Sequence, residues 1–182
     1  MSREVLQKIL EILDAVKAKW VLVGGTAVSY FTEPRVTLDT DLIVESTKLR
    51  TVIARVKKAF PEATIDEREA VFRIKPYEVD LIRSAGHPLY AEAIQHRELR
   101  EGMYLPPVEI YLALKFLSAR SIMRARERRM QDTADFLSVF KKHRASLNGK
   151  GLLTACAMAY PEARKDAEAL IDAIDHDKPI TL

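Results

Sequence analysis

Two acidic residues, Asp39 and Asp41, stand one residue apart at the start of an apolar segment. Successive side chains of a strand point to opposite faces, so a strand through this segment would place both carboxylates on one face. Leu38, Thr40 and Leu42 would occupy the opposite face. Two such charges repel unless a cation neutralises them, and magnesium bound with phosphate oxygens is the usual partner of a carboxylate pair without nearby histidine or cysteine. The pattern predicts a divalent-metal site, with a solvated edge strand as the alternative.

A glycine pair, Gly24-Gly25, follows the apolar run Trp20–Val23 and precedes Thr26–Phe31. The apolar run predicts a short buried strand and the later segment predicts a helix, so the glycines lie at a strand-to-helix turn. Bare backbone N–H groups and a helix N-terminus at such a turn can receive a phosphate. A phosphate-binding turn followed by a carboxylate pair on the next strand predicts a two-part site for a metal-bound nucleotide.

A third acid, Asp80, lies in a predicted hairpin. The segments Ala70–Ile74 and Glu78–Ile82 are joined by Lys75-Pro76-Tyr77, a pattern typical of two antiparallel strands. Asp80 alternates with apolar residues in the second arm, so its side chain faces away from them. We expect this strand to be able to lie beside the first carboxylate pair.

Composition bounds the class of protein. With 182 residues, of which 48% are hydrophobic and 30% charged, the chain is typical of a soluble globular protein with one substantial core or a helical appendage. No segment suggests a membrane span, and a predicted first helix at Ser2–Lys17 mixes acids with lysines, unlike a signal or transit peptide. The single cysteine, Cys156, cannot form an internal disulfide, which favours a cytoplasmic location.

An early helix is predicted at residues 46–60, capped by Ser46 or Thr47. After Gly86 the chain reads as helical, with helices predicted at residues 88–97, 131–142, 152–160 and 161–174. Another begins at Pro106-Pro107, because proline is tolerated in the first turn of a helix. Asn148–Gly151 has the composition of a linker.

Five arginines crowd into one stretch of ten residues. The net charge of +3 is too small to establish a nucleic-acid partner, but the local field of this stretch would attract phosphate or RNA. The alternative is a solvated helix face. The residues are Arg120, Arg124, Arg126, Arg128 and Arg129.

Taken in order, these motifs resemble the minimal nucleotidyltransferases of the DNA polymerase beta superfamily and, within it, the AbiEii-type toxin nucleotidyltransferases and their uncharacterised relatives. The resemblance runs from about Trp20 to Asp135. The residues that carry it are Gly24–Ala27, Arg35, Thr37, Asp39, Asp41, Val79–Leu81, Pro107, Glu109, Lys115, Arg129, Asp132 and Asp135.

The resemblance implies an α/β (α+β) fold. Residues 1–105 would form a mixed-sheet nucleotidyltransferase core with an N-terminal helix, and residues 106–182 a helical C-terminal subdomain. The implied reaction moves a nucleoside monophosphate from an NTP to a hydroxyl, with release of pyrophosphate. Such chemistry depends mainly on positioning and charge neutralisation, so a few carboxylates, a glycine turn and a lysine suffice.

Catalytic and metal-binding roles also follow from the resemblance. Asp39 and Asp41 would ligate Mg²⁺, or Mn²⁺ in its place. Asp80 would ligate the catalytic metal near the attacking hydroxyl. Lys115 would be the helical lysine that lies close to phosphate in the family.

The nucleotide-binding residues implied by the resemblance surround the glycine turn. Gly24, Gly25 and Thr26 would hold the triphosphate. Arg35 would bind a phosphate or neutralise the carboxylate pair, two alternatives that the residues leave open. Thr37 would support the site.

The resemblance implies a supporting role for the last motif, which contains Asp132 and Asp135. Asp132 and Asp135 would either position the substrate or support the helical lysine, and the sequence leaves both open.

We therefore predict an active, cytoplasmic, NTP-using nucleotidyltransferase without a membrane partner. Its acceptor would be RNA, through the Arg120–Arg129 stretch, or protein. It would act as the effector of a toxin-antitoxin or phage-defence pair, with a cognate antitoxin protein. Two alternatives stay open: a non-catalytic nucleotide- or protein-binding module of the same fold, and an enzyme that modifies a small molecule such as an aminoglycoside antibiotic.

Overall fold

The computed structural model describes residues 3–180 and separates the chain into two compact units. The first unit contains the chain up to Ala27 together with Arg35–Pro106. The second contains Val28–Pro34 and the chain from Pro107 onward. The short segment Val28–Pro34 therefore packs with the C-terminal half of the chain, although it lies within the range 1–105 that the sequence analysis assigns to the core.

The first unit is built on a five-stranded mixed sheet with the order β1-β2-β5-β4-β3. β2 and β5 run parallel, and all other neighbours in this sheet run antiparallel. The predicted α+β fold class is confirmed, and the predicted hairpin is the antiparallel pair β4–β5. The strands are β1 (Trp20–Val23), β2 (Thr40–Val44), β3 (Thr64–Arg68), β4 (Val71–Lys75) and β5 (Val79–Arg83).

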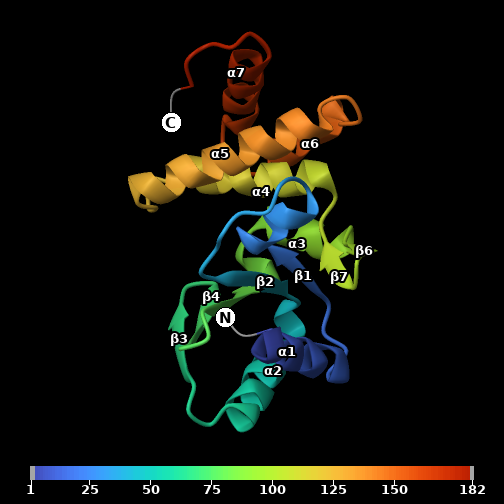
Figure 1. Cartoon of the computed structure of the whole chain (residues 1–182), viewed down its shortest axis with the longest axis vertical. Helices are drawn as coiled ribbons and strands as arrows, with labels where there is room; N and C mark the ends of the chain where they lie inside the picture. Colours follow the sequence, from blue (N-terminus) through green and yellow to red (C-terminus); the bar gives the residue numbers. More distant parts are fainter. Residues whose placement is uncertain (1–2, 181–182) are drawn as a thin grey trace. The chain divides into compact units, whose positions relative to one another are not determined.

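Helices α1 (Arg3–Ala15) and α2 (Ser46–Ala59) pack against each other, and α3 (Pro88–Gln95) contacts β1 and β2 (Figure 1). α1 ends two residues before its predicted end at Lys17, because Lys17 adopts a left-handed backbone with a φ of 53°. Its predicted start at Ser2 lies outside the described residues. A small hairpin of β6 (Glu98–Arg100) and β7 (Met103–Leu105) completes the unit, and β7 contacts β1.

The start of α2 corrects a prediction. Glu45, rather than Ser46 or Thr47, occupies the N-cap position, and no side chain caps the helix there. The Ser46 hydroxyl accepts a hydrogen bond from the Ala85 backbone N–H at 2.8 Å and lies 3.1 Å from Ser84 Oγ. Ser84 and Ala85 belong to the short 3-10 helix η2 (Ser84–Gly86) after β5. These contacts therefore link the start of α2 to the segment that follows β5.

The second unit is helical in its described part. α4 (Val108–Arg120) is its central element, since it packs against both α5 (Arg126–His143) and α6 (Gly149–Cys156). All residues from Ile110 to Phe116 in α4 are buried. α7 (Ala163–Asp175) packs on α6.

Two local predictions in this unit are wrong. α5 begins at Arg126, five residues before the predicted start at Gln131, so the arginine-rich stretch is partly helical. Asn148 is a helix cap rather than part of a linker, because its side-chain Oδ1 accepts a hydrogen bond from the Gly151 N–H at 3.0 Å.

Aromatic contacts hold the segment Val28–Pro34 in the second unit. The Phe31 ring stacks on Tyr111 of α4 with centroids 4.4 Å apart. The Phe31 carbonyl lies 2.8 Å from His143 Nε2 at the end of α5. These contacts bind the segment after the glycine turn to two helices that are far away in the sequence.

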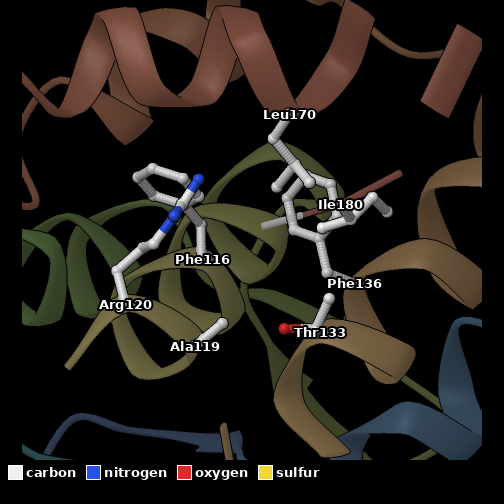
Figure 2. Close-up of a pocket in the computed structure, with 7 residues that line it drawn as sticks. All are labelled: Phe116, Ala119, Arg120, Thr133, Phe136, Leu170 and Ile180. Carbon is white, nitrogen blue, oxygen red and sulfur yellow. The ribbon is translucent and has the colours of Figure 1, made fainter. Parts of the chain in front are cut away.

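A shallow apolar pocket lies among α4, α5, α7 and the C-terminal tail (Figure 2). Its volume of about 10 Å³ corresponds to about one water molecule, so it cannot admit a nucleotide or an antibiotic in this form. No helix in the described residues is long and apolar enough to cross a membrane. The pocket is lined by Phe116, Ala119, Arg120, Thr133, Phe136, Leu170 and Ile180.

Candidate active site

The glycine turn follows β1 directly and touches one of the predicted metal ligands. Gly24 has a left-handed backbone with a φ of +67°. A Cβ atom on Gly24 would lie 1.8 Å from Asp41 Oδ2, so the carboxylate occupies the space that any side chain would need. Glycine is required here both by the backbone conformation and by the close approach of Asp41.

Gly25 is required for a different reason. Its backbone is not left-handed, but a Cβ atom there would lie 2.8 Å from Arg35 Nη2 and 2.9 Å from Thr37 Oγ1. The guanidinium of Arg35 therefore lies against the turn, and its Nη1 donates to the Val36 carbonyl at 3.2 Å. The turn thus places a cation and a hydroxyl beside partly buried backbone, which suits an anionic ligand.

Asp39 precedes β2, which corrects the prediction that it lies on the strand with Asp41. β2 begins at Thr40, so the strict alternation of faces does not extend back to Asp39 or Leu38. Leu38, expected on one face with Thr40 and Leu42, is 80% exposed, whereas Thr40 and Leu42 are buried.

Two threonine hydroxyls hold the backbone at Asp39. Thr26, the first residue of the 3-10 helix η1 (Thr26–Tyr30), donates to the Asp39 carbonyl at 2.9 Å. Thr37 Oγ1 lies 3.0 Å from the same carbonyl and 3.2 Å from Asp39 Oδ1. The segment predicted as a helix after the glycines is a short 3-10 helix. The Thr26 hydroxyl holds the backbone at Asp39 instead of pointing into open solvent.

Asp80 lies beside Asp41, as the sequence suggested. In the parallel pairing of β2 with β5, Asp41 is directly opposite Asp80. Residues paired in this way point to the same face of a sheet, and neighbouring strands lie roughly 4.8 Å apart. The sheet therefore brings together two of the three predicted catalytic acids, although 38 intervening residues separate them in the sequence.

Arg73 is a member of this cluster that sequence reasoning missed. It is paired with Asp80 in the antiparallel β4–β5 register. Its Nε donates to Asp80 Oδ1 at 3.1 Å and its Nη2 donates to Asp80 Oδ2 at 3.1 Å, so both carboxylate oxygens are engaged. The hydrogen bonds and charge of Asp80, with smaller contributions from Glu78 and Asp39, raise the pKa of Arg73 further.

The donor set suits magnesium. Carboxylate oxygens are the hard ligands that Mg²⁺ takes, and Mg²⁺ is usually held by one or two carboxylates together with substrate phosphates rather than by an all-protein cage. Within residues 3–180, no three acidic, histidine or cysteine side chains form a ready-made metal cage. Asp41 and Asp80, which the sheet pairs directly, are carboxylates of the kind that such a metal takes as ligands.

Lys115 belongs to the second unit, where it is buried in an ion-pair network. Its ammonium donates to Asp132 Oδ1 at 3.0 Å and to Asp135 Oδ2 at 2.7 Å. Gln131 Nε2 donates to Asp135 Oδ1 at 3.1 Å, and Arg124 Nη2 lies 3.4 Å from Asp132 Oδ2. The predicted lysine and the predicted closing acids are thus direct partners, and they connect α4 with α5.

Solved structures of other proteins share this architecture. An antigenic nucleotidyltransferase-like protein from Paracoccidioides brasiliensis matches with a TM-score of 0.54 and 19% identity, over 96% of this chain and 94% of its own. The antibiotic-resistance factor ANT(2'')-Ia matches with a TM-score of 0.57 and 13% identity, over 96% of this chain and 95% of its own. The chain has a nucleotidyltransferase-like fold.

The lincosamide antibiotic adenylyltransferase LnuA, solved with lincomycin bound, also has this fold. It matches with a TM-score of 0.53 and 14% identity, over 76% of this chain and 98% of its own. No protein-family model matches the sequence, and no curated protein matches it significantly. These matches show a nucleotidyltransferase-like fold, whereas the resemblance to the DNA polymerase beta superfamily and to AbiEii-type toxins stays a prediction.

The five arginines of the Arg120–Arg129 stretch lie in different environments. Arg126 and Arg128 are exposed in the first turn of α5. Arg124 is partly used within the unit, through Asp132 and through Ser118 Oγ at 3.4 Å. Arg129 is only partly exposed. The predicted basic surface is therefore narrower than the sequence suggests.

The signal for Arg73 lay in the hairpin, because the hairpin register decides which residue lies opposite Asp80. In the structure Ile74 pairs with Val79 and Arg73 with Asp80, so the connection between the paired residues is Lys75–Glu78. A connection counted as three residues, Lys75–Tyr77, conceals that pairing.

Proposed function

We propose that this protein is a metal-dependent nucleotidyltransferase that moves a nucleoside monophosphate from an NTP to a hydroxyl acceptor. One observation carries the proposal: Asp41 touches the glycine turn on one side and is paired with Asp80 on the other. A phosphate-binding turn and two neighbouring carboxylates are what phosphoryl transfer needs, because the reaction depends on positioning and charge neutralisation.

In the proposed reaction, the acceptor oxygen forms a bond to the α-phosphorus of the NTP. The bond from that phosphorus to the bridging oxygen breaks, and pyrophosphate leaves with the electron pair while the hydroxyl proton passes to water. Asp39 and Asp41 would hold the magnesium that accompanies the triphosphate, and Asp80 would hold the metal near the acceptor. Magnesium, when bound, neutralises the charge of the phosphates and polarises their oxygens.

The protein's own groups would orient the triphosphate. A phosphate could approach the backbone closely at Gly24 and Gly25, because neither residue carries a side chain. The guanidinium of Arg35 lies at the same turn, beside Gly25, and would bind a phosphate that enters there.

For Lys115, the contacts support a positioning role. Its side chain is 5% exposed, and its ammonium already pairs with two carboxylates, those of Asp132 and Asp135. Of the two roles considered for these acids, support of the lysine agrees best with the short distances.

Two acceptor classes have specific support. The exposed Arg126 and Arg128, at a helix N-terminus that already carries partial positive charge, favour RNA. The likeness in fold to ANT(2'')-Ia and LnuA favours a small-molecule hydroxyl as the second candidate. A role as a toxin or defence effector with an antitoxin partner rests on the sequence resemblance alone.

The test combines binding with transfer. Purified protein, Mg²⁺ and each α-labelled NTP are incubated with cellular RNA, with protein or with an aminoglycoside or lincosamide. We expect labelled acceptor with one class. The Asp39→Asn/Asp41→Asn double variant should lose metal-dependent NTP binding while remaining folded, whereas Asp80→Asn should lose transfer and keep most NTP binding.

The matched control is Asp66→Asn, which changes an acid of the edge strand β3 paired with Arg68. Tight NTP binding without transfer to any acceptor class would favour the binding-module alternative. Unchanged NTP binding in the double variant would contradict the site assignment.

A further inference from the structure

We propose that Arg73 is a positioning residue that holds the Asp80 carboxylate before metal binds and gives it up when a divalent cation arrives. The proposal rests on the proposed function, since it concerns the acid assigned there to the catalytic metal. The Asp80 carboxylate would bind either the Arg73 guanidinium or the divalent cation, but not both at once.

The first argument is the geometry of the ion pair. The guanidinium engages both oxygens of Asp80, each at 3.1 Å. A divalent cation bound to the same oxygens at about 2.1 Å would lie within a few ångströms of the guanidinium, and the two positive charges would repel strongly in this partly buried place. Simultaneous binding of the Arg73 guanidinium and a divalent cation to Asp80 is therefore unfavourable.

The second argument is which partner can move. The Asp80 side chain is 8% exposed and is held in the middle of the sheet, whereas the Arg73 side chain is 43% exposed. Arg73 can rotate toward solvent by changing its side-chain torsions, without any change in strand pairing. Asp80 cannot follow it, so the ion pair opens by movement of the arginine.

The third argument concerns charge balance. Asp41 and Asp80 are paired neighbours on one face of the sheet. Without a countercharge, two adjacent carboxylates repel each other, and the buried one is costly to ionise. Arg73 supplies that countercharge, and Asp39 and Glu78 add to the negative field around it. The Arg73 guanidinium therefore lies at the place where the metal would bind later.

The incoming nucleotide offers Arg73 a new partner. A triphosphate brings several anionic oxygens to the glycine turn, and a guanidinium binds phosphate as readily as carboxylate. Metal and nucleotide together would therefore compensate for the ion pair that opens. Metal alone would have to displace Arg73 without that compensation.

The experiment measures Mn²⁺ binding to the full chain without nucleotide, by electron paramagnetic resonance of the free ion. We expect Arg73→Gln to bind Mn²⁺ roughly tenfold more tightly than the parent, because a competing cation is removed. Arg73→Lys should lie between them, since a lysine keeps the charge but not the two-point hydrogen bonding. Adding Asp80→Asn to Arg73→Gln should abolish the gain.

Arg68→Gln is the control, because Arg68 also pairs with an acid, Asp66, but in the exposed edge strand β3. Circular dichroism checks that each variant is folded, and Arg73→Lys serves if Arg73→Gln is not. If Mn²⁺ affinity is unchanged or weaker in a folded Arg73 variant, the Arg73 proposal is wrong. The proposed NTP-transfer function is not contradicted by that result. If neither the parent nor any variant binds Mn²⁺ or NTP, the proposed function fails as well.

Discussion

Replacing Lys115 by methionine should destabilise the second unit strongly. Lys115 is the shared cation of Asp132 and Asp135, which are 6% and 2% exposed. Removing it leaves two buried carboxylates without their main countercharge, and breaking a buried ion pair in this way costs about 3–5 kcal/mol. Arg124 compensates little, because it reaches only Asp132, at 3.4 Å, and from a partly exposed position.

The loss would be a large part of the roughly 5–15 kcal/mol by which such proteins are stable. For a chain of this size each kcal/mol corresponds to about 2–4 °C, so the melting temperature should fall by roughly 10 °C in a thermal scan followed by circular dichroism. Lys142→Met is the matched control. Its ion pair with Glu33 spans 3.8 Å between exposed side chains, so we expect a change of less than about 0.5 kcal/mol.

Adding Asp132→Asn and Asp135→Asn to Lys115→Met should restore much of the stability, because no buried charge is then left unpaired. NTP affinity is measured on the same proteins. If Lys115→Met keeps its melting temperature but loses NTP binding, the lysine acts on phosphate directly and our reasoning about the buried network is refuted.

Three further outcomes are expected. Gly24→Ala should cost roughly 2 kcal/mol in urea unfolding, because the left-handed backbone and the Asp41 carboxylate both oppose a side chain; a cost below about 0.5 kcal/mol would contradict the close approach. Burial raises the pKa of the Cys156 thiol from 9.0 to about 12, so the unfolded state loses this proton first and the free energy of unfolding falls as pH rises above 9. The stability difference between the parent and Cys156→Ala should therefore shrink by about 1.4 kcal/mol between pH 8 and 10, and a constant difference would argue against that burial. If RNA binds at α5, Arg126→Gln/Arg128→Gln should flatten the log-log salt dependence of RNA affinity by about 1.4, whereas Arg124→Gln should leave the slope unchanged; an unaltered slope in the double variant would end the RNA-surface hypothesis.

Local patterns in the sequence were sufficient for much of the first unit. Alternation and apolar runs identified β1 and the hairpin β4–β5, and the glycine pair identified the turn after β1. These signals are reliable because they depend on the side-chain period of a strand and on the unusual backbone freedom of glycine. The same reasoning placed Asp80 on a strand able to reach Asp41, which the parallel pairing of β2 and β5 confirms.

Alternation failed where a strand ended. Asp39 and Leu38 were expected on defined faces of a strand, but β2 begins at Thr40. The backbone at Asp39 is instead held by hydrogen bonds from the hydroxyls of Thr26 and Thr37. Strand ends depend on which backbone groups find partners on the neighbouring chain, and a single segment does not contain that information.

By itself, the sequence determined the chemistry that is available: carboxylates beside a glycine turn, a helical lysine followed by two acids, and a mixed α and β composition. Only the tertiary structure decided which charges are partners. The Arg73–Asp80 pair depends on the hairpin register, and the contacts of Lys115 with Asp132 and Asp135 depend on how α4 packs against α5. The physical reason is that an ion pair forms where burial and geometry favour it, and both are set by non-local packing rather than by spacing along the chain.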